Sequence, residues 1–428
     1  MLAKDPADVR RYVGGVACFA CKPGAQPCRC NRRSRHAIGL RRCSSLTCTN
    51  ANPQEETTMA APYPLPESNP SALGFAERPL DHLDALIRAH VAEGRYAGAQ
   101  IALARHGKLA LCRTYGDART EGGTVPAGDD TLFLLFSQTK VLTSAAVWTL
   151  VEDGRLSFMD RVADHLPAFA ARGKGEITLH QVMTHQGGFP GGDVSQATWT
   201  DHARMRAEVC DFSLDWSPGS RLQYHPRAAH LVQAMVVEAV TGQDYRDVIR
   251  ERVIAPLGLG DDIFVGVPEA QQARCADTYA PEPRDNSAAF RAAGLPSGGG
   301  YATARGMAAF YQMLGNGGRL GGVRLFSPRL IAYVARNHTG EAPDVQMTNI
   351  PMHRGLGPHV RGESDRIRGL GTIGAPVTFG HGGVGSSYSW ADPSSGVSFS
   401  YLTNFVSPDP WHSARLDRVS NLVHAAID

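Results

Sequence analysis

The chain contains a single Ser-x-x-Lys sequence, Ser137-Gln138-Thr139-Lys140, between a strand-like run and an apolar segment. Residues 131–136 have the pattern of a strand, and residues 141–150 carry apolar side chains at helical spacing. This junction predicts that the serine opens a helix. Side chains three residues apart share one helix face, so a buried amine with a lowered pKa could accept the serine proton.

Lysine is scarce in this chain, which makes Lys140 an unusual residue. Only five of the 43 basic residues are lysine, and arginine supplies the rest. Arginine cannot lose its proton under ordinary conditions, whereas lysine can act as a base. The alternative interpretation of Ser137 and Lys140 is an unremarkable pair on a solvated helix face, because a bare motif is weak evidence.

The first 50 residues differ from the rest of the chain in charge and in cysteine content. They hold ten basic residues against two aspartates, a charge of +8, so the remainder carries −6 within a total of +2. Six of the nine cysteines are also there, including the pairs Cys18/Cys21 and Cys28/Cys30. Three interpretations are open: an incomplete zinc module, an organelle transit peptide, or upstream sequence that precedes a true start at Met59. We favour the third and set residues 1–75 aside as a leader that is disordered or wrongly included.

The remaining composition limits the classes of partner. A net charge of +2 gives no reason to expect nucleic acid, and no run of 18 apolar residues predicts a membrane span. Cys112, Cys210 and Cys275 are too few and too scattered for a disulfide framework, which is typical of a cytoplasmic protein. Nothing in the pattern specifies an oligomeric state.

Periodicity predicts strands at both ends of the body and helices in the middle. The fold class is therefore α/β (α+β), an antiparallel sheet flanked by helices with an inserted, mostly helical subdomain. We expect one domain over 76–428, with its sheet part at about 76–140 and 296–428 and its helical part at about 141–295. The expected helices are 81–93, 231–240, 245–253, 302–314 and one from Trp411, and the expected strands are 99–104, 109–115, 386–391 and 397–403.

Further segments accompany the Ser-x-x-Lys sequence in a fixed order. They are ITLHQVMTHQGGF at 177–189, PGSRLQY at 218–224, APLGL at 255–259, SGG at 297–299 and GHGG at 380–383. From about residue 79 to 425 the chain resembles the serine β-lactamase and penicillin-binding-protein superfamily, closest to its class C-like branch with the family VIII-type carboxylesterases. The resemblance implies the β-lactamase/transpeptidase-like fold.

The same resemblance assigns the candidate site residues. Ser137 is the nucleophile, Lys140 and Tyr224 are its proton-transfer partners, and the backbone N–H groups of Ser137 and Val384 form the oxyanion hole. His381, Gly382 and Gly383 stand at the substrate-binding strand, where the glycines permit close approach. The alternatives are a tyrosine packed beside a turn and a strand-end histidine in solvent.

Two departures from the family pattern bear on the substrate. Tyr224-His225-Pro226 has proline where the family has an amide, and proline offers no side-chain donor or acceptor. His381 replaces a lysine, so a mostly neutral imidazole stands where a permanent cation grips a substrate carboxylate. Both departures disfavour penicillin recognition and resemble the esterases of the superfamily.

No metal or other cofactor is expected. His180 with His185, and His225 with His230, are five apart and lack the spacing of a helical zinc site. His185 and the following glycines are expected to be structural. Gly-x-Ser-x-Gly is absent, which disfavours an α/β-hydrolase nucleophile elbow.

The sequence therefore predicts a serine hydrolase that works through an acyl-enzyme, with carboxylesterase action on small or medium acyl esters as the leading activity. Acyl transfer, D-amino-acid amidase or peptidase action and weak β-lactamase action remain open on the same fold. A non-catalytic, penicillin-binding-protein-like ligand binder is the alternative from another class. The expected partner is a small-molecule ester or amide substrate.

Overall fold

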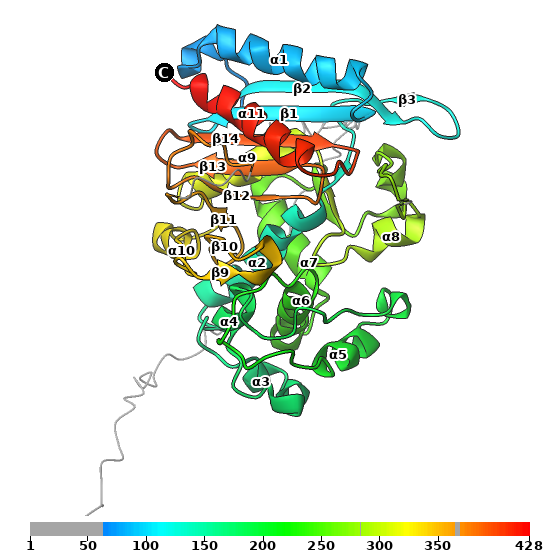
Figure 1. The fold of residues 1–428 in the computed structure, drawn as a ribbon, viewed down its shortest axis with the longest axis vertical. Coiled ribbons are helices and arrows are strands. Elements are labelled where there is room, and N and C mark those ends of the chain that lie inside the picture. The colour runs from blue at the N-terminus through cyan, green and yellow to red at the C-terminus, as the bar shows by residue number, and fades with distance from the viewer. Residues whose placement is uncertain (1–62, 283, 364–368) are drawn as a thin grey trace, which may run out of the picture. The chain divides into compact units, whose positions relative to one another are not determined.

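The computed structural model describes residues 63–282, 284–363 and 369–428, shown in colour in Figure 1. These residues all belong to one compact unit, Ala60–Asp428. The paired leader cysteines and Met59 lie outside the described residues. Within the described residues, no helix combines the length and the apolar composition needed to cross a bilayer.

A seven-stranded antiparallel sheet joins the two ends of the described chain. Its strand order is β11-β12-β13-β14-β1-β2-β3, so the hairpin β1–β2 pairs with the C-terminal hairpin β13–β14 through β1 and β14. The register runs from Ala99 opposite Thr403 to Arg105 opposite Val397. The strands are β1 (Gly98–Arg105), β2 (Lys108–Arg119), β3 (Val125–Pro126), β11 (His359–Val360), β12 (Phe379–Gly382), β13 (Tyr388–Asp392) and β14 (Val397–Thr403).

Helices cover both faces of this sheet, and β1 shows why. Alternate residues of a strand point to opposite faces. Ile101 and Leu103 belong to the core under α1 (Glu77–Ala92) and α11 (Trp411–Ala425), and Ala102 and Ala104 belong to the core that includes α9 (Ala304–Gly315). Figure 1 shows α1 and α11 together on one side of the strands. Burial on both faces explains why the apolar side chains of β1 do not alternate with exposed ones: the residues from 98 to 104 are all buried.

The helical part is built around α2 (Thr139–Glu152). Its residues from 139 to 150 are all buried, so this part of the helix has no solvent-exposed face and lies inside the fold. It packs against α6 (Ala228–Thr241) and α7 (Tyr245–Ile249). The other helices are α3 (Val162–His165), α4 (Leu179–Met183), α5 (His202–Cys210), α8 (Ala288–Ala293) and α10 (Pro328–Val334), and the small strands are β4 (Phe133–Leu134), β5 (Ile263–Val265), β6 (Gly300–Ala302), β7 (Arg319–Leu320), β8 (Val323–Arg324), β9 (Pro343–Asp344) and β10 (Ile350–Pro351).

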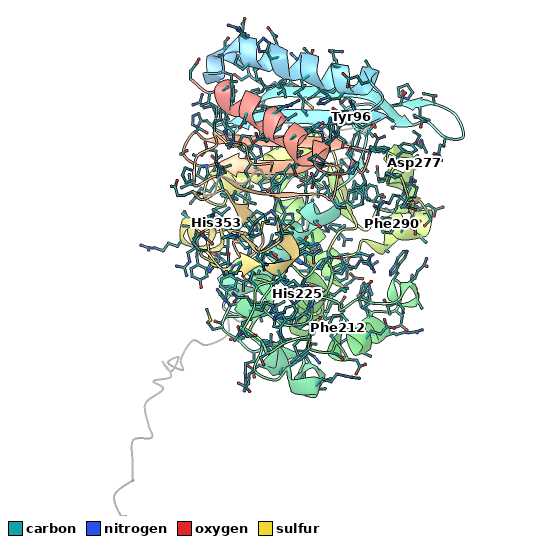
Figure 2. All side chains as sticks on the ribbon, in the orientation of Figure 1. Tyr96, Phe212, His225, Asp277, Phe290 and His353 are labelled. Atoms are coloured by element: carbon teal, nitrogen blue, oxygen red, sulfur yellow. The ribbon has the colours of Figure 1, made fainter. Side chains whose placement is uncertain are left out.

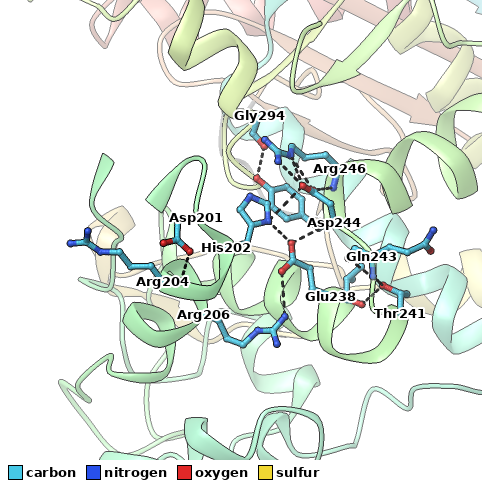
Figure 3. A network of polar contacts seen from close by, with 12 residues as sticks. Asp201, His202, Arg204, Arg206, Glu238, Thr241, Gln243, Asp244, Arg246 and Gly294 are labelled. Carbon is cyan, nitrogen blue, oxygen red and sulfur yellow. Dashed lines mark hydrogen bonds and ion pairs between the residues drawn. The ribbon is translucent and has the colours of Figure 1, made fainter. Parts of the chain in front are cut away.

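Charged side chains tie α5, α6 and α7 together (Figure 3). His202 Nδ1 lies 2.6 Å from Glu238 Oε1, and Arg206 pairs with the other carboxylate oxygen of Glu238 at 3.4 Å. Asp244 pairs with Arg246 at 2.5 Å. Both carboxylates of this cluster therefore have arginine partners, and we interpret the network as a clamp between helices.

The predicted fold class is confirmed, and most of the predicted elements are found close to their expected bounds. The strand expected at 397–403 is β14, and the helix expected from Trp411 is α11. The helix expected at 245–253 is divided into α7 and a π-helical turn at Arg250–Ile254.

Residues 63–75 were set aside with the leader, yet part of this segment packs into the domain. Leu65 and Phe75 are each 1% exposed and belong to the two main apolar cores. A short 3₁₀ turn, Ser71–Leu73, lies between them. Packing therefore starts upstream of residue 76.

Replacing Leu103 by alanine should lower the free energy of unfolding by about 2–5 kcal/mol, because the fully buried side chain would leave a cavity under the covering helices. Urea denaturation followed by circular dichroism measures the change. Val323→Ala, on an exposed short strand, is the control and should stay within about 0.5 kcal/mol of the parent protein. A loss at Leu103 as small as the control's would contradict the packing of the sheet against α1 and α11.

Candidate active site

Ser137 stands on a tight turn just before α2. It lies in the 3₁₀ turn Phe136–Gln138, and α2 begins at Thr139, so the prediction that Ser137 opens an α-helix needs correction. Phe136 has a left-handed φ of 47°, which interrupts the path from strand to helix. The strand predicted at 131–136 is accordingly reduced to β4.

Two hydrogen bonds hold this turn against β6. The Leu135 N–H donates to the Gly300 carbonyl at 2.8 Å, and the Gly300 N–H donates to Thr139 Oγ1 at 2.9 Å. The serine is thus fixed between β6 and the first residue of a buried helix.

Lys140 and Tyr224 both reach the hydroxyl of Ser137. The distance from Lys140 Nζ to Ser137 Oγ is 3.0 Å, and the distance from Tyr224 Oη to the same oxygen is also 3.0 Å. Lys140 Nζ also donates to the carbonyl oxygen of Ser297 at 2.6 Å, which gives the SGG segment a contact with the site. The structure therefore brings together the three residues that the sequence picked out from positions 137, 140 and 224.

Burial determines the protonation states of Lys140 and Tyr224. Lys140 is 1% exposed, and burial first, then the charges of Arg354 and Arg227, hold its pKa well below the ordinary lysine value. Burial raises the pKa of Tyr224, whereas its hydrogen bond with Ser137 and the charge of Arg354 act in the opposite direction. The favoured resting state is a neutral amine beside a neutral phenol. In that state Ser137 can donate to the amine while the phenol donates to Ser137 Oγ.

The segment around His185 packs against the Tyr224 ring. The His185 ring lies 4.8 Å from the Tyr224 ring, and its Nδ1 accepts the backbone N–H of His225 at 3.0 Å. The His225 ring donates from Nδ1 to the Gln223 carbonyl and accepts the Phe189 N–H at Nε2. His225, labelled in Figure 2, is fully buried, and burial lowers its pKa to about 4. These two histidines connect the 177–189 and 218–224 segments.

His381 lies inside the protein and not in solvent. It is 2% exposed, its Nδ1 donates to the Gly382 carbonyl at 2.8 Å, and its ring stacks on His359 at 4.1 Å. Burial, followed by the charge of Lys140, lowers its pKa to about 3. The interpretation of a solvated strand-end histidine is therefore wrong. The imidazole is neutral where the resemblance led us to compare it with a lysine.

Close packing within the fold favours glycine at both positions after His381. A Cβ at Gly382 would lie 2.7 Å from the Tyr388 ring, and a Cβ at Gly383 would lie 2.7 Å from the Leu135 carbonyl oxygen. Gly383, the residue after β12, thus packs directly on the backbone that leads into the turn carrying Ser137, called here the nucleophile turn after its predicted role. This contact places Val384, which follows Gly383, beside the segment that carries Ser137.

A buried arginine anchors the turn that contains Val384. Arg415 of α11 is 1% exposed and donates to the carbonyl oxygens of Gly385, at 3.0 Å, and Ser386. Its guanidinium also lies over the rings of three aromatic residues, Tyr96, Tyr401 and Trp411, at 5.0–5.4 Å. Cation–π contacts and carbonyl oxygens together stabilise its buried charge.

A second buried arginine lies against the candidate catalytic group. Arg354 and Asp344 form an ion pair at 2.5 Å, with exposed side-chain fractions of 2% and 0%. The Arg354 guanidinium lies 4.8 Å from the centre of the Tyr224 ring, and Asp344 Oδ1 accepts the Tyr224 backbone N–H at 3.2 Å. Sequence reasoning missed both residues and also Arg415, because none lies in a motif.

Comparison with known proteins agrees with this geometry. The family model described as Beta-lactamase matches residues 83–422. The chain belongs to the Beta-lactamase family. The predictions of the superfamily, the fold and a serine hydrolase are therefore confirmed.

Three relatives illustrate the range of this family. Esterase/beta-lactamase LipL of Mycobacterium tuberculosis (strain ATCC 25618 / H37Rv) is 29% identical over 73% of this chain and 79% of its own length. The crystal structure of a family VIII carboxylesterase superposes with a TM-score of 0.72 at 27% identity, covering 82% of this chain and 99% of that one. A penicillin-binding protein homologue from Caulobacter crescentus has the same TM-score and identity, covering 84% and 98%.

Stability should fall in mild acid, because protonation of buried imidazoles opposes folding. An unfolded histidine has a pKa of about 6.5, whereas that of His381 is about 3 in the fold. Its contribution is therefore present above pH 6.5 and is lost as the pH falls below that value. Between pH 7 and pH 5 this amounts to about 2 kcal/mol. Urea denaturation of the parent protein and of His381→Asn at both pH values measures the effect. Equal pH dependence in the two proteins would contradict a buried, neutral His381.

Proposed function

We propose that this member of the Beta-lactamase family is a carboxylesterase that forms an acyl-enzyme on Ser137. The observation that carries the proposal is the pair of 3.0 Å contacts that Lys140 and Tyr224 make with one hydroxyl oxygen. Ser137 and Tyr224 are only partly buried, so a substrate carbonyl has access, whereas Lys140 is enclosed. An enclosed amine with a lowered pKa is suited to act as a general base.

In the acylation step, Ser137 Oγ bonds to the ester carbonyl carbon as its proton passes to Lys140 Nζ. The carbonyl oxygen gains negative charge, which the backbone N–H groups of Ser137 and Val384 are proposed to hold. The contact of Gly383 with the nucleophile turn and the anchor on Arg415 support this placement of the two donors.

The tetrahedral adduct then collapses with cleavage of the bond to the leaving-group oxygen. The Tyr224 phenol gives its proton to that oxygen, and the Lys140 ammonium returns a proton to the phenolate. Water attacks the acyl-enzyme with the proton movements reversed, which restores the free enzyme. An alcohol in place of water would give acyl transfer.

The neutral surroundings of the strand β12 support an ester substrate over a penicillin or a D-amino-acid peptide. His381 is buried and uncharged, and Pro226 supplies no side-chain donor. Arg354 is enclosed and already paired with Asp344, so it is not open to a substrate carboxylate. One similar structure is named a family VIII carboxylesterase, which agrees with this preference, and another relative is named Esterase/beta-lactamase, so esterase is the activity that the two names share.

We also propose a small or medium acyl ester as the substrate and the cytoplasm as the setting. Within the described residues Cys112, Cys210 and Cys275 are free thiols, which supports a reducing compartment.

Ser137→Ala should lower the kcat/KM for a short-chain nitrophenyl ester by roughly a thousandfold or more, because the attacking oxygen is lost. Lys140→Arg should be similarly damaging, because arginine keeps the charge but cannot accept the proton. Ser71→Ala, a surface substitution, is the control. The parent protein should turn over the nitrophenyl ester faster than a chromogenic cephalosporin.

Intact mass after treatment with a covalent phosphonate separates the competing explanations. A single adduct in the parent protein and none in Ser137→Ala supports the nucleophile. Labelling of Ser137 without turnover of ester or lactam would favour the ligand-binding interpretation over the esterase.

The kcat/KM should rise with pH along one acidic limb, because protonated Lys140 cannot accept the serine proton. Its lowered pKa places the midpoint well below the ordinary lysine value. Activity should fall again only at alkaline pH, where Tyr224, whose pKa is raised, loses the proton that it donates. Initial rates at low substrate concentration from pH 5 to 11 measure both limbs. Activity that still climbs through the ordinary lysine range would contradict a general-base lysine.

A further inference from the structure

Two basic side chains lie close to the Tyr224 ring. Lys140 Nζ is 5.4 Å from the ring centre, and the Arg354 guanidinium carbon is 4.8 Å from it. Lys140 takes up and releases a proton in the proposed reaction, so its charge changes during the cycle. Arg354 remains charged throughout, because a guanidinium does not lose its proton in proteins.

Several contacts fix Arg354 in this position. One terminal nitrogen donates to Asp344 at 2.5 Å, and the other donates to His359 Nε2 at 3.0 Å. The side chain is 2% exposed and immobilised from two sides. Arg354 therefore does not contact a substrate, and its influence has to pass through the residues that it touches.

The other polar groups that face Tyr224 are few. Ser137 bonds to its hydroxyl, Asp344 accepts its backbone N–H, and His185 lies beside its ring. His185 is buried, and burial, followed by the charge of Arg354, holds its pKa well below the ordinary histidine value, so it is neutral. Asp344 is the one carboxylate among these groups, and it opposes the effect of Arg354.

The charge of Arg354 matters for Tyr224 because His381 is neutral. When Tyr224 gives its proton to a leaving alkoxide, a phenolate forms in a partly buried site. Desolvation penalises that charge unless a positive charge is close. His381, with a pKa of about 3, cannot supply a positive charge at neutral pH, whereas Arg354 supplies a permanent one at the ring face.

We propose that Arg354 is a positioning residue of the reaction, whose fixed charge over the Tyr224 ring supports proton donation from the phenol to a poor leaving group. Asp344 sets the strength of this support by partly neutralising the guanidinium. The inference rests on the proposed esterase function and deepens it, because it predicts that the enzyme is built to cleave alkyl esters as well as activated aryl esters.

The test compares two esters of the same acid, one with a nitrophenyl and one with an ethyl leaving group. Nitrophenolate leaves without protonation, whereas ethoxide requires a proton from Tyr224. Arg354→Gln should therefore lower the kcat/KM of the ethyl ester at least tenfold more than that of the nitrophenyl ester. A change in the rate of attack by Ser137 affects both esters, so it cancels in the ratio of their kcat/KM values. An equal fall for both esters would overturn the proposal and make Arg354 merely structural.

Two further variants test the charge itself. Arg354→Lys should keep the ratio of the two esters within about threefold of the parent value, because a cation is retained. Asp344→Asn should move the alkaline limb of the pH profile to lower pH, because the guanidinium is no longer neutralised, whereas Arg354→Gln should move it to higher pH. Shifts of the same sign in these two variants would contradict the proposal.

Removing one partner of a buried ion pair threatens folding, so the double variant Asp344→Asn/Arg354→Gln serves as the neutral replacement. Circular dichroism and thermal unfolding show which variants are folded, and the ratio of the two esters is compared only among those. The double variant should show the same selective loss of ethyl ester turnover as Arg354→Gln. If the parent protein hydrolyses neither ester, the proposed function fails; if it hydrolyses both and the ratio is unmoved in the folded variants, only the role of Arg354 fails.

Discussion

The site depends on burying one lysine amine, with which no carboxylate pairs among the residues that the structure describes. The hydrogen-bond partners of Lys140 Nζ are the Ser297 carbonyl and the Ser137 hydroxyl, both of them uncharged. An ammonium ion in such a place is costly, so the neutral amine is favoured, which is the form that the proposed general base requires. A carboxylate in contact would stabilise the ammonium and remove that property.

Much of the fold serves to maintain this enclosure. The helix α2 is buried on every side, and its Thr143 hydroxyl donates to the Pro296 carbonyl, which fixes the segment that carries Ser297. The nucleophile turn is tied to β6, and β12 packs on its backbone through Gly383. The sheet and the helical part thus each contribute one side of the site.

Positive charge is distributed around the site in a way that the motifs alone do not indicate. The residue at the strand edge, His381, is neutral, and the fixed charges are those of Arg354 behind Tyr224 and Arg415 behind the turn of Val384. Both arginines are enclosed by carbonyl oxygens, rings or a buried carboxylate. Their charge therefore acts on protein groups and is withheld from substrate carboxylates, which agrees with a preference for uncharged esters.

The sequence was sufficient to predict the residues that sit in local motifs. Ser137 and Lys140 are three residues apart across the start of α2, which keeps their side chains within reach of each other, and the ordered segments pointed to Tyr224 as the third residue. The strand expected at 131–136 is reduced to β4 in the structure. Its extent is set by the left-handed backbone at Phe136 and by pairing with the distant strand β6, and the local sequence pattern shows neither.

Asp344, Arg354 and Arg415 could not be predicted in the same way. Tyr224, which lies against the pair of Asp344 and Arg354, is 120 residues from Asp344 along the chain. A lone arginine or aspartate has the same appearance in a sequence whether it is buried or solvated. The packing of Tyr224 reveals Asp344 and Arg354, and the hydrogen bonds to Gly385 and Ser386 reveal Arg415. The glycines of β12 were also expected to admit a substrate, whereas the structure gives each a neighbour within its own fold.

The most direct test of the account is an NMR titration of the lysine side chains. The chain has only five lysines, so a protein labelled with ¹³C at the lysine ε-carbon gives a simple spectrum, and Lys140→Arg assigns the resonance of interest. We predict that Lys140 loses its proton at a pH well below the ordinary lysine value of about 10.4 and lower than any other lysine. If all five resonances titrate together near the ordinary value, the amine beside Ser137 is an ammonium ion at neutral pH and the proposed general base does not exist.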